Sequence, residues 1–212
     1  MASSPQLRFV LASASPARLA TLRAAGIEPT VHVSGLDESG VRATDPATLA
    51  LELARLKGEA VLAEINTQVD QVIVACDSVL EVDGRPLGKP GTDAEVRRYW
   101  SLLRGRSADL WTGHHVMVSQ HGQIRRVTHT ARTTVSFAPI TDAELTAYIA
   151  TGEPHQVAGG FTIDGYGSAF IERIAGDPHN VVGISLPLLR ILLHQVDVAW
   201  PDLWDRTRVG VE

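Results

Sequence analysis

The chain has 212 residues, of which 44% are hydrophobic and 20% are charged, and its formal net charge is −5. This hydrophobic content is enough to bury a full core, either as one domain or as two small lobes around a cleft. The net negative charge argues against a general nucleic-acid surface or anionic-membrane surface, because both need a basic face.

The single cysteine and the lack of long apolar segments bear on the compartment. Cys76 has no partner for an internal disulfide, which favours a reducing compartment, so we expect the cytoplasm. No secretory signal is apparent at residues 1–5, and the apolar stretch 181–193 is too interrupted to span a bilayer. We therefore expect neither a membrane nor a nucleic acid as a partner.

The first predicted unit is a strand over residues 7–12 followed by a helix over about residues 16–26. Ser15 is the expected N-cap, Pro16 takes the first helical position, and Arg18 lies in the first turn. The free N–H groups of such a helix start, its partial positive charge and a neighbouring guanidinium suit phosphate oxygens. The corner is predicted to bind an anion, although a Ser-Pro pair also begins many ordinary helices.

The remaining elements follow from hydrophobic periodicity, capping residues and turn chemistry. In chain order they are a strand over 29–34, a polar loop over 35–45, a helix over 45–65, a strand over 71–75, a hairpin of 79–82 and 85–87, a helix from 92 or 93 to 103, strands over 110–119 and 124–137, a helix over 141–151, a glycine-rich segment over 158–167, a strand over 168–174 and a helix over 186–196. The sequence shows no repeat and no long linker. We expect one compact α/β unit over residues 1–212 whose lobes share a cleft, with a packed tail after about residue 197.

Several polar residues lie near the ends of these elements or in the loops beside them. They are Ser13, Ser15, Arg18, Glu38, Lys57, Asp77 and Lys89. The cations and the helix start suit a polyphosphate, while the two carboxylates suit Mg²⁺ or Mn²⁺. Asp77 follows the predicted strand 71–75, and ligands of open α/β sheets bind at the carboxyl ends of strands. A turn or helix cap is the alternative role for Asp77.

Other motifs do not support a different chemistry. Residues 84–89 approach a P-loop, but the spacing is one residue short and Pro90 replaces the Ser or Thr that would hold magnesium. His114 and His115 are expected on opposite faces of a strand, and no histidine has the spacing of a zinc site. Cys76 lies in an apolar strand, where a thiol is usually a small core residue.

Taken in order, the motifs resemble those of the Maf proteins, which are nucleoside triphosphate pyrophosphatases. The matching residues are Ser13-x-Ser15-Pro16-x-Arg18, Glu38, Lys57, Ala75-x-Asp77-Ser78, Gly88-Lys89-Pro90, Ala158-Gly159 and the run from Asn180 to Pro187. The resemblance covers about residues 7–195. It implies a Maf/ITPase-like α/β fold with an elongated mixed sheet, flanking helices and two lobes around a central cleft. It also implies hydrolysis of the bond between the α and β phosphates, a divalent metal (Mg²⁺ or Mn²⁺), and often a homodimer.

The resemblance also assigns roles to individual residues. Asp77 would be the proton acceptor that activates water, and Glu38 would help it to hold the metal or to orient that water. The triphosphate would be bound by Ser13, Ser15, Arg18, Lys57 and Lys89, and base selectivity would be set at Ala17, Ser78 and Asp164.

The chain departs from the family pattern on the base side. Ala17 replaces the first of two arginines that many members carry, and Asp164 stands where some members have a glutamine. Val157 replaces a polar residue and Phe161 a tyrosine. We hypothesise a preference for pyrimidine or modified triphosphates. The alternative is a nucleotide-binding regulator of cell division without significant catalysis.

Overall fold

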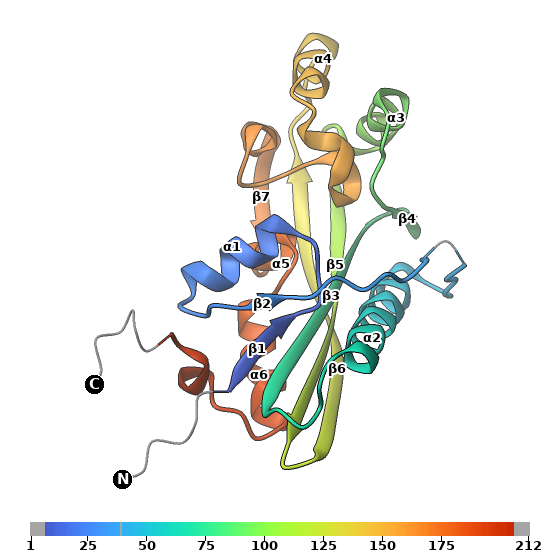
Figure 1. Cartoon of the computed structure of the whole chain (residues 1–212). Helices are drawn as coiled ribbons and strands as arrows, with labels where there is room; N and C mark the ends of the chain where they lie inside the picture. Colours follow the sequence, from blue (N-terminus) through green and yellow to red (C-terminus); the bar gives the residue numbers. More distant parts are fainter. Residues whose placement is uncertain (1–6, 39, 206–212) are drawn as a thin grey trace.

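The computed structural model describes residues 7–38 and 40–205 and shows a seven-stranded mixed sheet with helices against both faces (Figure 1). The strands are β1 (Arg8–Leu11), β2 (Thr30–Val31), β3 (Gln71–Val82), β4 (Arg85–Leu87), β5 (Ser107–Gln120), β6 (Gln123–Phe137) and β7 (Ile171–Ala175). The helices are α1 (Pro16–Ala24), α2 (Pro46–Glu64), α3 (Asp93–Leu103), α4 (Asp142–Ala150), α5 (Pro178–Val182) and α6 (Leu186–Gln195). The strand order is β2-β1-β3-β5-β6-β7, with β4 paired to β3.

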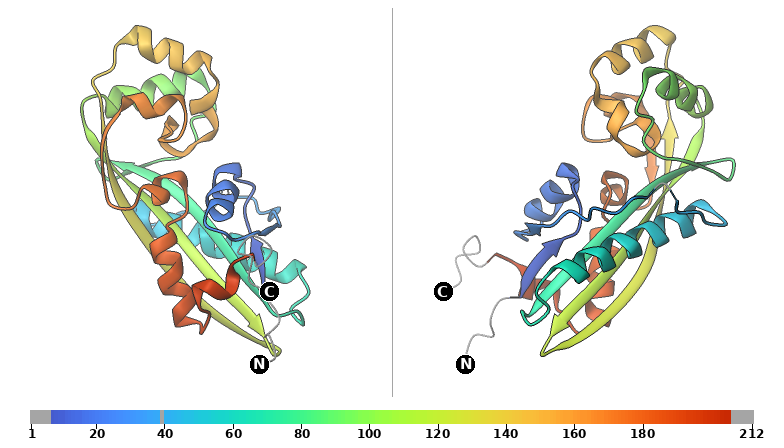
Figure 2. Two further views of the ribbon diagram at one scale, coloured as in Figure 1. Left: turned by 90° about the vertical axis from the view of Figure 1, so that its left-hand side faces the viewer. Right: turned by 45° about the vertical axis from the view of Figure 1, so that its right-hand side comes forward.

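Three long antiparallel strands form the spine of the molecule. β3 has 12 residues, β5 has 14 and β6 has 15. They run the length of the molecule, with α1, α2 and α6 along one half and α3 and α4 at the other end (Figures 1 and 2). This arrangement confirms the predicted fold class, an elongated mixed sheet with flanking helices and two lobes.

Asp77 lies in the middle of β3, and the prediction that it ends a strand is wrong. The parallel pairing of β1 with β3 stops at Leu11 and Val74, but the antiparallel pairing of β3 with β5 continues to Glu81. The polar residues after Cys76 therefore interrupt the apolar run without ending the strand. Asp77 lies just past the carboxyl end of β1, so the rule about ligand position applies to the parallel part of the sheet.

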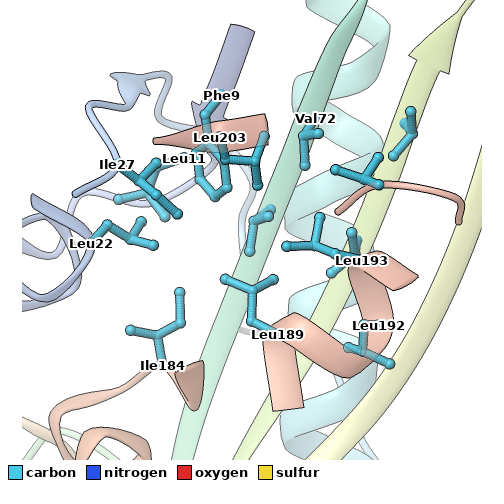
Figure 3. Packing of buried hydrophobic residues seen from close by; sticks show 14 of the residues in the cluster. Phe9, Leu11, Leu22, Ile27, Val72, Ile184, Leu189, Leu192, Leu193 and Leu203 are labelled. Carbon is cyan, nitrogen blue, oxygen red and sulfur yellow. The ribbon is translucent and has the colours of Figure 1, made fainter. Parts of the chain in front are cut away.

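Side chains alternate between the two faces of β3 and build separate cores. Val72, Val74 and Cys76 pack in the cluster that contains leucines of α1 and α6. Figure 3 shows Leu22, Ile184 and Leu189 from that side converging on the sheet. Ile73 and Ala75 belong instead to the cluster that contains Val61 and Leu62 of α2. Because both faces of this strand are covered, its sequence is a continuous apolar run.

Helix α2 lies close to the sheet because it carries a glycine on its inner face. Its start is capped by Asp45, whose side chain accepts the N–H of Thr48 at 2.8 Å. A Cβ added at Gly58 would lie 2.7 Å from the His115 ring, so a larger residue would push the helix away from β5. This close packing brings the neighbouring Lys57 next to Asp77 in the middle of β3.

The other lobe is built around Trp100 of α3, which is fully buried. Its ring makes edge contacts with Phe137, Tyr148 and Phe170, and its Nε1 donates to the carbonyl oxygen of Gly160 at 3.0 Å. The predicted capping box of α4 is confirmed, since Thr141 and Glu144 exchange hydrogen bonds. The aromatic cluster therefore anchors the glycine-rich segment to the lobe.

Several predicted boundaries differ from the structure. The strand expected over 29–34 is paired only at Thr30–Val31. Its partner β1 ends at Leu11, so β2 has no further residues to pair with. Residues 168–170, predicted as the start of a strand, belong to a 3₁₀ helix over Tyr166–Phe170, and β7 begins at Ile171. Glycines on either side of Tyr166 allow that turn, which periodicity alone does not reveal. The short helix α5 was not predicted.

The C-terminal segment packs on the first lobe. A 3₁₀ helix covers Trp200–Leu203, with Leu203 buried and Trp200 partly buried against the same core. Trp204 is partly exposed and lies beside Gly26. The tail predicted after about residue 197 is described as far as Asp205, and residues 206–212 lie outside the described part. Within the described ranges, none of the helices has the length and apolarity needed to cross a membrane.

Candidate active site

A cavity of about 540 Å³ brings together every site residue expected from the sequence. Its lining includes Ser13, Ser15, Ala17, Arg18, Glu38, Lys57, Asp77, Ser78, Lys89 and Asp164. These residues come from the β1–α1 corner, the loop after β2, helix α2, the middle of β3, and the two segments that follow β4 and α4. The volume and the mixture of charges suit a small polyanionic ligand.

The β1–α1 corner has the predicted cap geometry. Ser15 is the N-cap, and its hydroxyl accepts the backbone N–H of Arg18 at 3.4 Å. The buried hydroxyl of Ser13 accepts the N–H of Ser15 at 3.2 Å and an Nη1 hydrogen of Arg18 at 3.0 Å. The corner is therefore a folded hydroxyl and guanidinium cluster at a helix N-terminus, a setting that favours anions.

Arg18 is held by contacts on three of its nitrogens. Besides the Ser13 contact, its Nε donates to the Gly183 carbonyl oxygen at 2.7 Å and its Nη2 donates to Ser78 Oγ at 3.1 Å. Gly183 has φ +120°, and a Cβ there would lie 3.0 Å from Arg18 Nε. Glycine is therefore required for this approach. Sequence reasoning missed Gly183 as a partner of Arg18, because the contact spans 165 positions of the chain.

A buried polar chain continues from Ser78 across the sheet. Ser78 Oγ lies 2.9 Å from Thr112 Oγ1, which donates to the Asn180 carbonyl oxygen at 3.1 Å. The Asn180 side chain donates to Leu110 O at 3.2 Å and to Thr133 Oγ1 at 3.1 Å. Buried polar groups that are paired in this way fix the geometry of their neighbours. Asn180 begins one of the motifs that carry the resemblance, but its contacts with Thr112 and Thr133 were not predicted, because they join segments far apart in the chain.

His114 supports the same region in its neutral form. Nδ1 lies 2.9 Å from the Thr112 carbonyl oxygen, and Nε2 accepts the N–H of Ser185 at 2.8 Å. Burial lowers the pKa of His114 to about 4, despite the hydrogen bond to Thr112. His115 contacts Glu59 of α2 instead, which confirms that the two histidines face opposite sides.

Lys57 lies between the two predicted carboxylates. Its Nζ is 3.0 Å from Glu38 Oε1 and 2.5 Å from Asp77 Oδ1. The side chains of Lys57 and Asp77 are only 16% and 14% exposed, whereas that of Glu38 is 45% exposed. Solvent therefore screens the Lys57–Asp77 pair less than a surface pair. Glu38 and Asp77, which are 39 positions apart by number, converge on a single cationic group.

This convergence bears on a divalent metal. Among the described residues, no group of three or more His, Cys, Asp or Glu side chains could hold a metal ion. Mg²⁺ commonly takes only one or two carboxylates and completes its shell with waters and substrate phosphates. Because Glu38 and Asp77 share one cation, they fit a metal that is bound together with a polyphosphate.

The sequence profile of the Maf-like proteins matches residues 8–196. This chain belongs to the Maf family. A relative from Cutibacterium acnes is 52% identical over 95% of this chain and 97% of the relative, and one from Saccharopolyspora erythraea is 53% identical over 93% and 97%. Both carry the name nucleoside triphosphate pyrophosphatase. The solved structure of the Staphylococcus aureus Ham1 protein matches 62% of this chain and 72% of its own, with 21% identity and a TM-score of 0.40, which is too low to support an argument.

In this Maf protein, the positions that depart from the family pattern all line the pocket, most of them in the segment after α4. The lining there is mainly apolar, with Val157, Phe161 and Ile163 from the segment after α4, and it includes the exposed Asp164. Ala17 of α1 also lines the pocket. None of the positions that depart from the pattern therefore adds a positive charge to the lining.

Cys76 is a core residue, as predicted. It is fully buried and packs with the α1 and α6 side, and burial raises the pKa of its thiol to about 12. Its neighbour Asp77 lines the pocket, but Cys76 does not appear among the lining residues. A role for this thiol as a nucleophile is therefore excluded by both position and protonation.

Proposed function

We infer that this chain is a nucleoside triphosphate pyrophosphatase. The observation that carries the inference is the cluster of Lys57, Glu38 and Asp77 in a pocket that also holds Arg18 and Lys89. Membership of the Maf family and the names of relatives at about half identity support the same activity. Two carboxylates within a set of cations suit hydrolysis of a polyphosphate.

We propose that the bond broken is the one between the α and β phosphates. Arg18, Lys57 and Lys89 bind the triphosphate, with the hydroxyls of Ser13 and Ser15 at the start of α1. Phosphoryl transfer depends chiefly on positioning and on neutralising charge that develops on the phosphate oxygens. The three contacts that hold Arg18 in place reduce the reorganisation needed when the substrate reacts.

Asp77 acts as the proton acceptor for the attacking water. The carboxylate lies at the pocket surface beside Lys57, which neutralises charge at the reacting centre. Glu38 orients the same water and, with Asp77, holds a divalent ion, Mg²⁺ or Mn²⁺. When bound, this ion supplies a Lewis acid that shields the phosphate charge. The products are a nucleoside monophosphate and pyrophosphate.

The base side of the pocket sets substrate preference in this proposal. Ala17, Ser78 and Asp164 line the pocket, and we propose a preference for pyrimidine or modified nucleoside triphosphates. A nucleotide panel in which only ATP and GTP are turned over would contradict that preference.

Two further properties belong to the same proposal. We place the enzyme in the cytoplasm, because its one cysteine is a free buried thiol and fits a reducing compartment. We also propose a homodimer, which the partly exposed Trp204 and Ile191 would suit as interface residues.

The experiment is a metal-dependent assay of pyrophosphate and monophosphate release from dTTP, UTP, CTP, GTP, ATP and common modified nucleotides. We expect Asp77→Asn to lose activity by about 10²- to 10⁴-fold, the usual contribution of general acid–base catalysis. Asp83→Asn is the matched control, because Asp83 lies in the β3–β4 turn at φ 51°, where asparagine is also tolerated. Tight nucleotide binding without any product would favour the alternative, a nucleotide-binding regulator.

A further inference from the structure

Outside the catalytic cluster, the carboxylate of Glu153 accepts hydrogen bonds from a whole loop. Glu153 follows α4 in a 3₁₀ helix, and sequence reasoning did not single it out. The donors are Tyr148 Oη at 3.0 Å, Thr162 Oγ1 at 2.5 Å, the Gly167 N–H at 2.9 Å and the Tyr166 N–H at 2.8 Å. Three of them belong to the segment 162–167, so a single side chain connects both ends of this segment.

The two glycines of this segment leave room for the Glu153 carboxylate and the Tyr148 hydroxyl, because they have no Cβ atom. A Cβ at Gly165 would lie 2.2 Å from Glu153 Oε2, and a Cβ at Gly167 would lie 2.6 Å from Tyr148 Oη. Any other residue at either position would displace Glu153 or Tyr148. The glycine-rich composition of the segment is thus explained by its close wrapping around Glu153.

The hydrogen bonds also determine the charge of the group. Burial by itself would raise the pKa of Glu153, but the hydrogen bonds from Thr162, Gly167, Tyr166 and Tyr148 outweigh it and lower the pKa. Glu153 is therefore an acceptor at neutral pH. Each of its four neighbours supplies a donor, which only a carboxylate can accept in full.

The segment that Glu153 holds is one wall of the pocket. Thr162, Ile163 and Asp164 all line the cavity. Phosphate oxygens are repelled by the Asp164 carboxylate and are drawn to Arg18 and Lys57, so this wall faces the base and sugar of a nucleotide. We propose that Glu153 is a positioning residue that sets the base-facing wall and thereby controls affinity for the nucleoside part of the substrate. This inference rests on the proposed function, because it takes the ligand to be a nucleotide.

The test compares two ligands in Glu153→Gln. Glutamine has nearly the same shape, but its amide N–H₂ would face N–H donors of the loop. We expect the KM for a nucleoside triphosphate to rise by about 10-fold, the effect of roughly one hydrogen bond, with a smaller change in kcat. The dissociation constant of inorganic tripolyphosphate, measured by calorimetry, should stay within about 2-fold, because that probe has no base or sugar.

Two variants serve as controls. Glu172→Gln changes an exposed carboxylate on β7 outside the pocket lining and should alter neither constant. Tyr148→Phe removes one of the four donors and should raise the KM less than Glu153→Gln does. If Glu153→Gln does not fold, Tyr148→Phe decides the question by the same two constants.

A parallel rise of the nucleotide KM and the tripolyphosphate dissociation constant would show a general structural role and overturn the proposal. So would an unchanged KM in a folded variant. If the wild-type protein releases no pyrophosphate, the proposed function fails on its own. The role of Glu153 is then still tested by calorimetric binding of the nucleotide, which should weaken in the variant while tripolyphosphate binding does not.

Discussion

The two sides of the pocket that we propose for the phosphates and for the base are held by different means. On the phosphate side, Arg18, Lys57 and Asp77 project from α1, α2 and β3. Arg18 is held by Gly183, after α5, and Lys57 is paired with Asp77, so each contacts a different element of the fold. On the base side, residues 162–164 lie in a loop that Glu153 and two glycines hold together.

We infer from this difference that the two sides of the pocket have separate tasks. The charges that we propose to meet a reacting phosphate project from α1, α2 and β3, and such fixed positions reduce reorganisation during a reaction. The loop can change its side chains without disturbing the sheet, because its backbone shape depends on Glu153 and the glycines. In the proposed function, this separation lets the base side depart from the family pattern while the proposed catalytic residues are kept.

The largest expected effect concerns the cation between the carboxylates. Lys57→Met leaves Glu38 and Asp77 without their shared positive charge, and we expect kcat/KM to fall by at least about 100-fold. Lys89→Met is the matched comparison on the exposed rim, where solvent screens the charge, and we expect a loss of about 10-fold or less. Initial rates of pyrophosphate release measure both. Equal losses of kcat/KM in the two variants would contradict the prediction that the buried position of Lys57 between the two carboxylates makes its charge more important.

The next effect concerns the buried hydrogen bonds behind the phosphate side. The pKa of His114 is about 4 in the folded chain, against 6.5 as its ordinary value, so between these values the unfolded chain binds the proton first. The free energy of unfolding should therefore fall as the pH drops from about 6.5 towards 4, with His114 contributing about 2 to 3 kcal/mol.

Urea denaturation at neutral and acid pH measures this contribution. In His114→Gln the loss on acidification should be smaller by that amount, while His194→Gln, which changes an exposed histidine of α6, should behave as wild type. Other groups that titrate in this range act in both proteins, so the difference between them isolates His114. The same pH dependence in His114→Gln and wild type would refute the assignment.

The smallest expected effect is on the base side. Asp164 is exposed and can only accept hydrogen bonds, whereas asparagine can also donate. Asp164→Asn should shift the ratio of kcat/KM between two bases by about 3- to 10-fold, because exposed polar contacts are weak. Competition between two triphosphates in one reaction measures the ratio, with Asp202→Asn as an exposed control. A fall of kcat for all bases alike would place Asp164 with the catalytic residues.

Local signals in the sequence predicted much of this molecule. The Ser15 cap, the α4 capping box, the long β5–β6 hairpin and the buried Cys76 follow from residue chemistry and periodicity. Polar residue types at element ends also identified the residues that line the pocket. Their catalytic and binding roles stay predictions.

Other features depended on contacts between distant segments. Asp77 lies within a continuous strand because β5 keeps pairing with β3 after β1 has ended. The partners of Arg18 and of His114, the shared contact of Lys57, and the loop around Glu153 join residues far apart in the chain.

The sequence by itself determined most of the element types, the cap residues and the set of charged groups, because these depend on neighbours within a few positions. Only the tertiary structure decided which groups meet. Hydrogen-bond partners and strand pairing are set by how the chain packs in three dimensions, and periodicity along the chain carries no information about them.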